Sequence, residues 1–228
     1  MPITPFRPRI GVAFVAYWAF LLSIHASPAF ATEPPAQRDD SASQSAATDG
    51  KLIPPTAAAL KESVQLARDV YKDDFAKARK PEEKTQWARK LLELAAEEKD
   101  PAARFALLSL ARDTAVDAGD LGTAGSAIDG LDSTFRVDAW QLKAEAATTI
   151  AKALRTPEGR KGFEAQVQPV IEQAVGTERY GVARQLADLA LAVAHAAADA
   201  MLVRQANACV TRVREAEAAY AELKTAQT

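Results

Sequence analysis

Residues 100–131 read DPAARFALLSLARDTAVDAGDLGTAGSAIDGL, and this stretch decides the fold. Asp100-Pro101 is typical of a helix start, because aspartate caps the first turn and proline is tolerated at the first helical position. The apolar positions that follow recur every three or four residues, at Phe105, Leu108, Ala111 and Ala115. Gly119 offers a C-terminal cap, and Asp120 opens the next helix. The stretch therefore predicts two helices joined by a tight turn.

Similar start and stop signals recur along the rest of the chain. Helices are predicted to begin at or near Thr56, Pro81, Pro101, Asp120, Asp138, Pro157, Glu178 and Asp199. The first is expected to run unbroken over residues 56–79, and Pro169 is expected either to kink its helix or to delay the start to Val170. No stretch alternates as a strand does. The sequence thus predicts an all-α domain over residues 55–225, with about eight antiparallel helices stacked as hairpins.

The first 31 residues have the three parts of a secretory signal peptide. Arg7 and Arg9 form a positive start, residues 10–24 are almost wholly apolar, and Ala29-Phe30-Ala31 fits signal peptidase. We expect cleavage before Thr32, export to the periplasm or beyond, and no stable membrane span afterwards. The alternative is a tether to the membrane by an uncleaved anchor, although about 15 apolar residues are fewer than the roughly 20 that span a bilayer.

Residues 32–54 read TEPPAQRDDSASQSAATDGKLIP, a stretch rich in Ser, Ala, Pro, Asp and Gln. Its one apolar pair is Leu52-Ile53. Such a composition buries too little apolar surface to offset the entropy of ordering the chain. We expect residues 32–54 to be a disordered linker that holds the helical domain away from the envelope or the export machinery.

Composition narrows the class of protein. Hydrophobic residues make up 48% of the 228 residues but aromatic ones 7%, and 51 alanines account for the difference. Alanine is small and the best helix former, which favours many closely spaced helices. A net charge of −2 excludes a strongly basic nucleic-acid binder. The single cysteine, Cys209, excludes an intrachain disulfide and a cysteine-based zinc cage. We expect it to be a small buried side chain, with a disulfide between two chains as the alternative.

Groupings that could carry catalytic or metal chemistry are few. His195 has Asp199 four residues on, but two ligands do not make a metal site. The acidic pairs at 73–74, 82–83 and 97–98 are expected on solvated faces, because adjacent helical residues point about 100° apart. Gly119, Gly122 and Gly125 have part of the spacing of a dinucleotide fingerprint, but no strand precedes them. We therefore predict no catalytic, cofactor-binding or metal site.

Other polar and aromatic residues receive structural interpretations. The turn from Gly159 to Gly162 is expected to be a connecting loop. Three arginines of the last helix alternate with acids and form no nucleic-acid stripe, at Arg204, Arg212 and Arg214. Trp87 and Trp140 are expected to anchor the core of so aromatic-poor a domain, and lining a binding groove is the alternative.

Two predicted helices share a pattern of small and apolar residues. Laying Ala88 on Ala183 also aligns Leu91 with Leu186, Leu94 with Leu189, and Ala95 with Ala190. A weaker third copy begins at Ala124, which lies 36 residues after Ala88, near the 34-residue period of tetratricopeptide (TPR) repeats. A small residue at that position allows paired antiparallel helices to approach closely. We expect a TPR-like α-solenoid fragment, although the full TPR signature is missing.

The order of short motifs also resembles the secreted helical modules of large exported planctomycete proteins. The motifs that carry the resemblance lie at Tyr71–Lys77, Arg89–Leu92, Asp100–Leu108, Ala118–Asp120 and Tyr180–Ala187. The resemblance spans roughly residues 60–222 and implies an all-helical exported module. The family has no established function, so the resemblance implies neither an activity nor a cofactor.

These observations favour an exported, non-enzymatic helical-repeat protein that binds another protein or a peptide. The alternative is a structural envelope component that associates with copies of itself through exposed apolar helix faces. An enzyme is the third hypothesis, and it lacks a nucleophile, base and orienting group together.

Overall fold

Capping side chains occupy most of the predicted helix starts in the computed structural model, which describes residues 50–226. Thr56, Asp100, Asp120, Asp138, Thr156 and Asp199 each accept a hydrogen bond from a main-chain N–H two or three residues further on. At Pro81 the cap is Glu83, whose carboxylate accepts from the N–H groups of Arg79 and Lys80. Gly119 ends its helix with a φ of 76°, as a left-handed C-cap requires. These local signals therefore set the helix boundaries.

Nine helices make up the described residues. They are α1 (Ala57–Val70), α2 (Lys72–Lys77), α3 (Pro81–Glu97), α4 (Pro101–Ala118), α5 (Leu121–Thr134), α6 (Ala139–Ala153), α7 (Pro157–Gly176), α8 (Tyr180–Ala197) and α9 (Ala200–Ala226). The all-α prediction is confirmed. Within residues 50–226, none of these helices combines the length and the apolar character needed to cross a bilayer.

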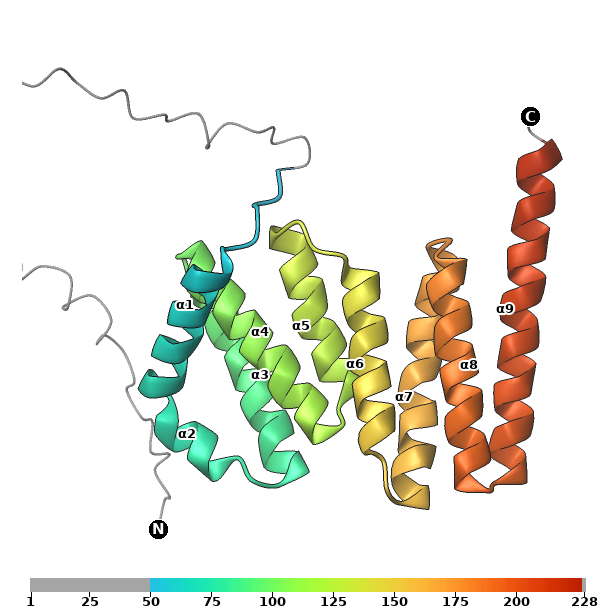
Figure 1. The fold of residues 1–228 in the computed structure, drawn as a ribbon, viewed down its shortest axis with the longest axis horizontal. Coiled ribbons are helices and arrows are strands. Elements are labelled where there is room, and N and C mark those ends of the chain that lie inside the picture. The colour runs from blue at the N-terminus through green and yellow to red at the C-terminus, as the bar shows by residue number, and fades with distance from the viewer. Residues whose placement is uncertain (1–49, 227–228) are drawn as a thin grey trace, which may run out of the picture. The chain divides into compact units, whose positions relative to one another are not determined.

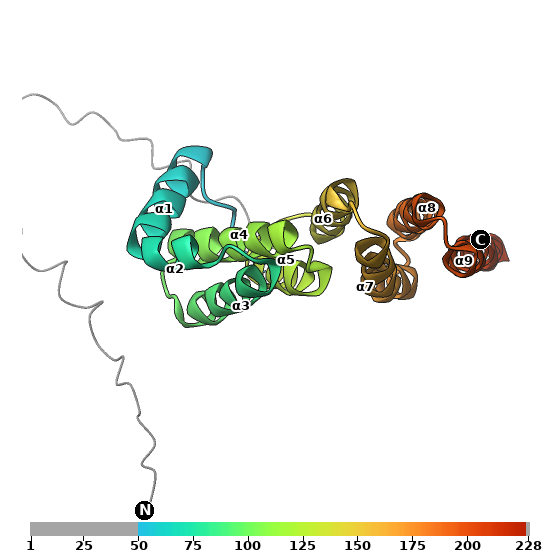
Figure 2. The same cartoon turned by 90° about the horizontal axis from the view of Figure 1, so that it is seen from below.

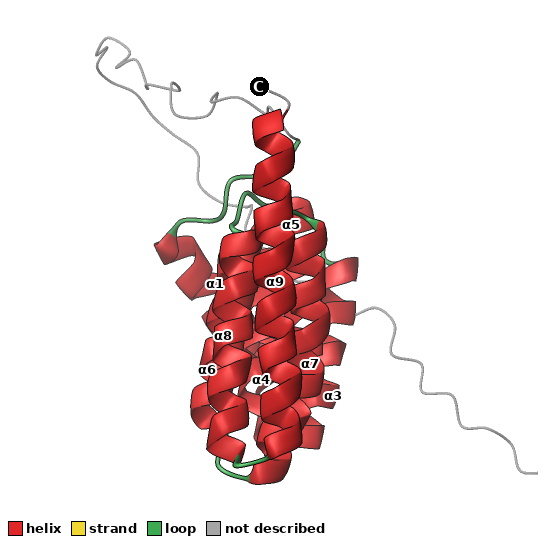
Figure 3. Ribbon diagram, turned by 90° about the vertical axis from the view of Figure 1, so that its right-hand side faces the viewer, coloured by secondary structure: helices red, strands yellow, loops and turns green. Residues whose placement is uncertain are grey.

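The helices from α3 to α9 pack in two layers. Each helix contacts the next in the chain, and helices two apart also touch, as α3 with α5 and α4 with α6. Figure 2 shows the result: α4, α6 and α8 lie in one row, and α3, α5, α7 and α9 in the other. Successive helices alternate in direction (Figure 1). The last turns of α9 extend past the ends of its neighbours (Figure 3). The predicted stack of helices is therefore present.

Alanine forms much of the core. Of the 35 buried hydrophobic residues within the described range, 16 are alanines, so the helices pack with little side-chain volume between them. Ala88, Ala124 and Ala183 are fully buried, as expected. Ala88 and Ala124 lie on α3 and α5 of one layer, but Ala183 lies on α8 of the other. This change of layer explains the irregular second step of the sequence repeat.

The expectation of one helix over residues 56–79 is wrong. The chain turns at Tyr71, where φ is −104° and ψ is 23°, and divides the segment into α1 and α2. The turn brings two rings onto Trp87: the ring centroids of Tyr71 and Phe75 lie 5.6 and 5.3 Å from its own. Aromatic packing thus outweighs helix continuity, and it adds a ninth helix to the expected eight.

The expectation of a start delayed to Val170 is wrong, because α7 runs continuously from Pro157 to Gly176 with Pro169 inside it. Proline has no N–H to donate to the carbonyl four residues earlier. Both Pro169 and Ala165, the residue that loses this hydrogen bond, are exposed. The lost bond therefore faces solvent, where a helix tolerates it best.

The end of the predicted linker belongs to the helical domain. The N–H of Leu52 donates to the carbonyl of Thr134 at 2.8 Å, and its carbonyl accepts from Arg136 at 2.8 Å. Lys51 forms an ion pair with Asp132 at 2.7 Å. Residues 51–52 are therefore paired with the end of α5 rather than disordered. The predicted signal peptide, its cleavage position and the linker up to residue 49 lie outside the described residues.

Candidate functional site

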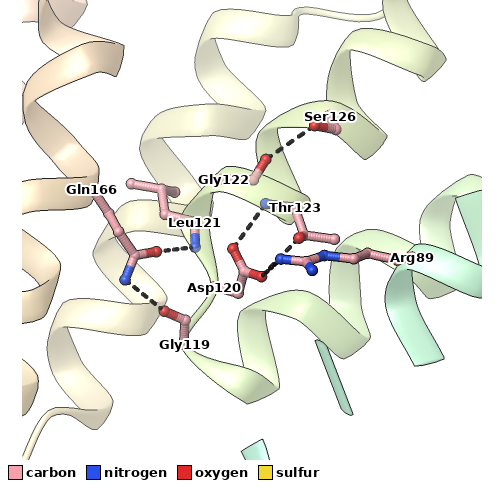
Figure 4. Close-up of polar contacts among 8 residues, drawn as sticks. All are labelled: Arg89, Gly119, Asp120, Leu121, Gly122, Thr123, Ser126 and Gln166. Atoms are coloured by element: carbon pink, nitrogen blue, oxygen red, sulfur yellow. Dashed lines mark hydrogen bonds and ion pairs between the residues drawn. The ribbon is translucent and has the colours of Figure 1, made fainter. Parts of the chain in front are cut away.

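The turn between α4 and α5, where the sequence shows three spaced glycines, carries a cluster of polar contacts (Figure 4). Asp120 accepts from the N–H of Thr123 at 2.9 Å and from its hydroxyl at 2.7 Å. Arg89 of α3 lies 3.8 Å from the same carboxylate. Asp120 therefore caps α5 and joins it to α3.

Gln166 of α7 completes this cluster from a distance of more than forty residues in sequence. Its Oε1 accepts from the N–H of Leu121 at 2.7 Å, and its Nε2 donates to the carbonyl of Gly119 at 3.3 Å (Figure 4). The N–H groups of Leu121 and Thr123 that a phosphate would use at this helix start are thus paired with protein side chains. The segment Gly119–Gly125 acts as a connection between helices, and no sequence pattern pointed to Gln166.

His195 and Asp199 stand at the α8–α9 connection in separate roles. His195 is exposed in the last turn of α8, and Asp199 accepts from the N–H groups of Met201 and Leu202 as the cap of α9. Among residues 50–226 no three His, Cys, Asp or Glu side chains gather as metal ligands would.

The two tryptophans differ in their surroundings. Trp87 is buried among Tyr71 and Phe75 and is a core anchor, as expected. Trp140 is half-buried, and the ammonium of Lys143 lies 4.8 Å from the centroid of its ring. Lys143 is itself buried and pairs with Asp129 at 2.8 Å and Gln173 at 3.0 Å. This lysine links α6 to α5 and α7, which nothing in the sequence indicated.

The remaining charged candidates lie mostly in solvent. Asp73, Asp74, Glu82 and Glu97 are exposed, as are Arg204 and Arg214. The predicted loop from Gly159 to Gly162 is instead part of the first turns of α7. Arg212 is exposed too, but it borders a groove, described next, that the sequence did not reveal.

A groove of about 500 Å³ lies between α7 and α9, and we call it the α7–α9 groove. It is lined by Lys161, Glu164, Ala165 and Gln168 of α7 and by Leu202, Gln205, Ala208 and Arg212 of α9. Its volume falls within the range of small-molecule and cofactor sites, roughly 300–1,000 Å³. Five of the eight lining side chains carry a charge or an amide.

Glu164 gives this groove its chemical character. The residue is 5% exposed. Its Oε1 accepts from Nε2 of Gln168 at 2.8 Å, whereas its Oε2 is buried and has no hydrogen-bond partner. A buried acceptor without a partner costs about 1–3 kcal/mol, and more when the group is charged. Glu164 therefore brings a buried acceptor without a donor to the wall of the groove.

The main chain of α7 adds a second acceptor. Ala165 lines the groove, and Pro169 deprives its carbonyl of the usual helical N–H. Glu164 and Ala165 are adjacent, so a buried side-chain oxygen without a partner and an exposed backbone carbonyl freed by Pro169 lie in the same turn of helix.

Cys209 lies buried beside the groove, as a small core residue was expected to. Burial raises the pKa of its thiol, and the nearby Arg212 and Gln168 act in the opposite direction. An activated cysteine has a lowered pKa. Cys209 therefore has the character of a structural thiol.

Two other hollows are less suited to a ligand. One, of about 330 Å³, borders the unpartnered indole N–H of Trp87, but its carboxylates are engaged: Asp74 pairs with Lys77, and Glu83 caps α3. The other, of about 320 Å³ between α4 and α6, contains Arg112, which pairs with Asp113 at 2.8 Å. The α7–α9 groove is thus the best candidate site.

No protein family, no curated protein and no solved structure matches this chain.

Proposed function

We propose that this chain is an exported, non-enzymatic binding protein that holds another protein or a peptide on its helical stack. One observation carries the proposal: Glu164 lines a charged groove between two helices of one layer, and its enclosed Oε2 has no donor of its own. Stacked helices present side chains from successive helices on a continuous surface, which suits recognition of an extended partner. Export rests on the signal-like residues before Thr32.

The chemistry of the groove supports binding rather than catalysis. It offers charges and amides, and the nearby thiol of Cys209 has a raised pKa. Catalysis by a thiol needs a lowered pKa and a base within hydrogen-bonding reach. A protein that holds its ligand without reacting needs neither.

A pull-down experiment tests this function: the full chain is immobilised and incubated with envelope extract from its own source. The proposal predicts one retained protein at near-stoichiometric amount, which an excess of free chain displaces. An extract that leaves no such protein behind would refute it.

Self-association is the second candidate, and the outer side of α1 favours it. Leu66 and Val70, four residues apart, are 64% and 51% exposed at the end of the stack. A second copy docking there would extend the stack. The mass of the full chain in solution separates the two functions, because a monomer at micromolar concentration contradicts self-association.

A further inference from the structure

We propose that the α7–α9 groove binds an extended peptide in which a basic side chain, placed on Glu164, is flanked by acidic side chains. This inference rests on the proposed function and names the chemistry of its ligand. Three features carry it: the order of charges along the groove, the unpartnered oxygen of Glu164 beside the carbonyl that Pro169 frees, and the length of the groove.

The charges follow one another along the groove in the order positive, negative, positive. α7 and α9 run in the same direction, since α8 reverses the chain between them (Figure 1). Lys161 acts electrostatically on Asp199 at the start of α9, whereas Arg212 lies beside Cys209, further along. Glu164 stands between them on the face of α7 that also presents Gln168. A complementary ligand is therefore acidic, basic and acidic in order.

The central position requires a donor with several hydrogens. Oε2 of Glu164 has no partner, and the carbonyl of Ala165 has lost its helical N–H to Pro169. An ammonium has three donors and a guanidinium five, so either group can serve a carboxylate and a carbonyl together. A single amide N–H would satisfy one of the two and leave the charge of Glu164 uncompensated.

The groove is long enough for a short stretch of extended chain. The eight residues from Lys161 to Gln168 rise about 10 Å along α7, because seven steps of 1.5 Å separate the first from the last. An extended peptide advances about 3.3 Å per residue, and its alternate side chains point to the same side. A basic residue with an acidic residue two positions before it and two positions after it therefore presents all three charges to one wall.

A matched set of peptides tests this inference on the full chain. The probe is acetyl-Ala-Glu-Ala-Lys-Ala-Glu-Ala-amide, and its controls are the charge-reversed acetyl-Ala-Lys-Ala-Glu-Ala-Lys-Ala-amide and the version with three glutamines. Calorimetric titration at low salt should show the probe binding at least tenfold more tightly than either control. Equal binding of the reversed or neutral peptide would overturn the inference.

Variants assign the binding to the groove. Glu164→Gln keeps the shape of the side chain but removes its charge, and it should weaken binding of the probe about tenfold, as loss of one charged hydrogen bond does. Pro169→Ala returns an N–H to the carbonyl of Ala165 and should also weaken binding. Glu172→Gln, on an exposed part of α7, should bind as the wild type does. Unchanged binding by folded Glu164→Gln or by Pro169→Ala would contradict the inference.

Free alanine and free lysine are titrated as well, because the ammonium and carboxylate of a free amino acid could match the charges of the groove without a peptide. Binding of the free amino acids without the blocked probe would overturn the peptide assignment. Failure of this inference can be told apart from failure of the proposed function. If the immobilised chain and its Glu164→Gln variant retain the same partner equally well, the binding function stands and the assignment of binding to this groove is wrong.

Discussion

Close contact between α4 and α5 predicts opposite effects of one substitution at two glycines of the same helix. Gly125 and Gly130 both lie inside α5, where alanine is favoured over glycine by about 1 kcal/mol. A Cβ at Gly125 meets nothing within 4 Å. A Cβ at Gly130 lies 2.9 Å from Cδ2 of Leu108, closer than the 3.5–4.0 Å at which carbon atoms attract.

The magnitudes follow from these distances. Gly125→Ala should raise the free energy of unfolding by about 1 kcal/mol, the full gain in helix propensity. Gly130→Ala has the same gain, but buried Leu108 must move within a packed core, and overpacking of this kind costs about 1–3 kcal/mol. We therefore expect Gly130→Ala to leave the free energy of unfolding unchanged or to lower it by up to about 2 kcal/mol. The Gly130→Ala variant should then be about 1–3 kcal/mol less stable than the Gly125→Ala variant.

Urea unfolding followed by circular dichroism at 222 nm measures both variants against the wild type. For a chain of this size each kcal/mol also moves the Tm by about 2–4 °C. A Leu108→Ala substitution in each background closes a double-mutant cycle, and the coupling should be favourable with Gly130→Ala and near zero with Gly125→Ala. Equal stabilisation by the two alanines would refute the close approach of α4 and α5.

Four further predictions concern single side chains. Glu164→Gln should raise the free energy of unfolding of the free chain by about 1 kcal/mol in urea titrations, because it removes a buried charge with an unpaired oxygen; destabilisation by that amount would contradict the assignment. Cys209 should react with iodoacetamide at pH 8 at least about a hundredfold more slowly in the native chain than in urea, since burial limits access and raises its pKa; comparable rates would show an accessible thiol. Asp120→Ala should lower the free energy of unfolding by about 1–2 kcal/mol, the loss of a cap, and an unchanged midpoint would argue against the cluster of Figure 4. Backbone hydrogen bonds from Lys80 and then Arg79 lower the pKa of Glu83, so the stability that Glu83 gives the fold should be present above the ordinary glutamate pKa and be lost as pH falls through the lowered pKa. The difference in free energy of unfolding between the wild type and Glu83→Gln should therefore shrink to zero in that acid range. A difference that grows as pH falls would contradict the lowered pKa.

The fold could be predicted closely because its signals are local. Asp100, Gly119 and Asp120 act through groups within three residues, so the sequence alone identified the helix ends that the structure contains. The break at Tyr71 escaped prediction because its cause is Trp87, on another helix. The alternative of a start delayed to Val170 failed for a related reason: the cost of Pro169 within a helix depends on whether the freed carbonyl is exposed, and that depends on tertiary packing.

The candidate site could not be predicted from the sequence, because it depends on pairs of residues from different helices. Glu164 resembles any other helical glutamate until α9 packs beside it and buries it. Gln166 and Lys143 likewise acquire their roles only through distant partners, the α4–α5 turn and Gln173. The proline in the middle of α7 was the one signal within reach, because a helix that retains a proline leaves a carbonyl free at a known position.

Site-specific photo-crosslinking in intact cells tests the binding function of the α7–α9 groove most directly. A photoreactive phenylalanine analogue replaces Gln205, which lines the groove, or Gln185, which is exposed on α8. An adduct between the chain and one other protein is expected from position 205 and none from position 185. No adduct from position 205, or an adduct formed only with a second copy of the chain, would contradict it.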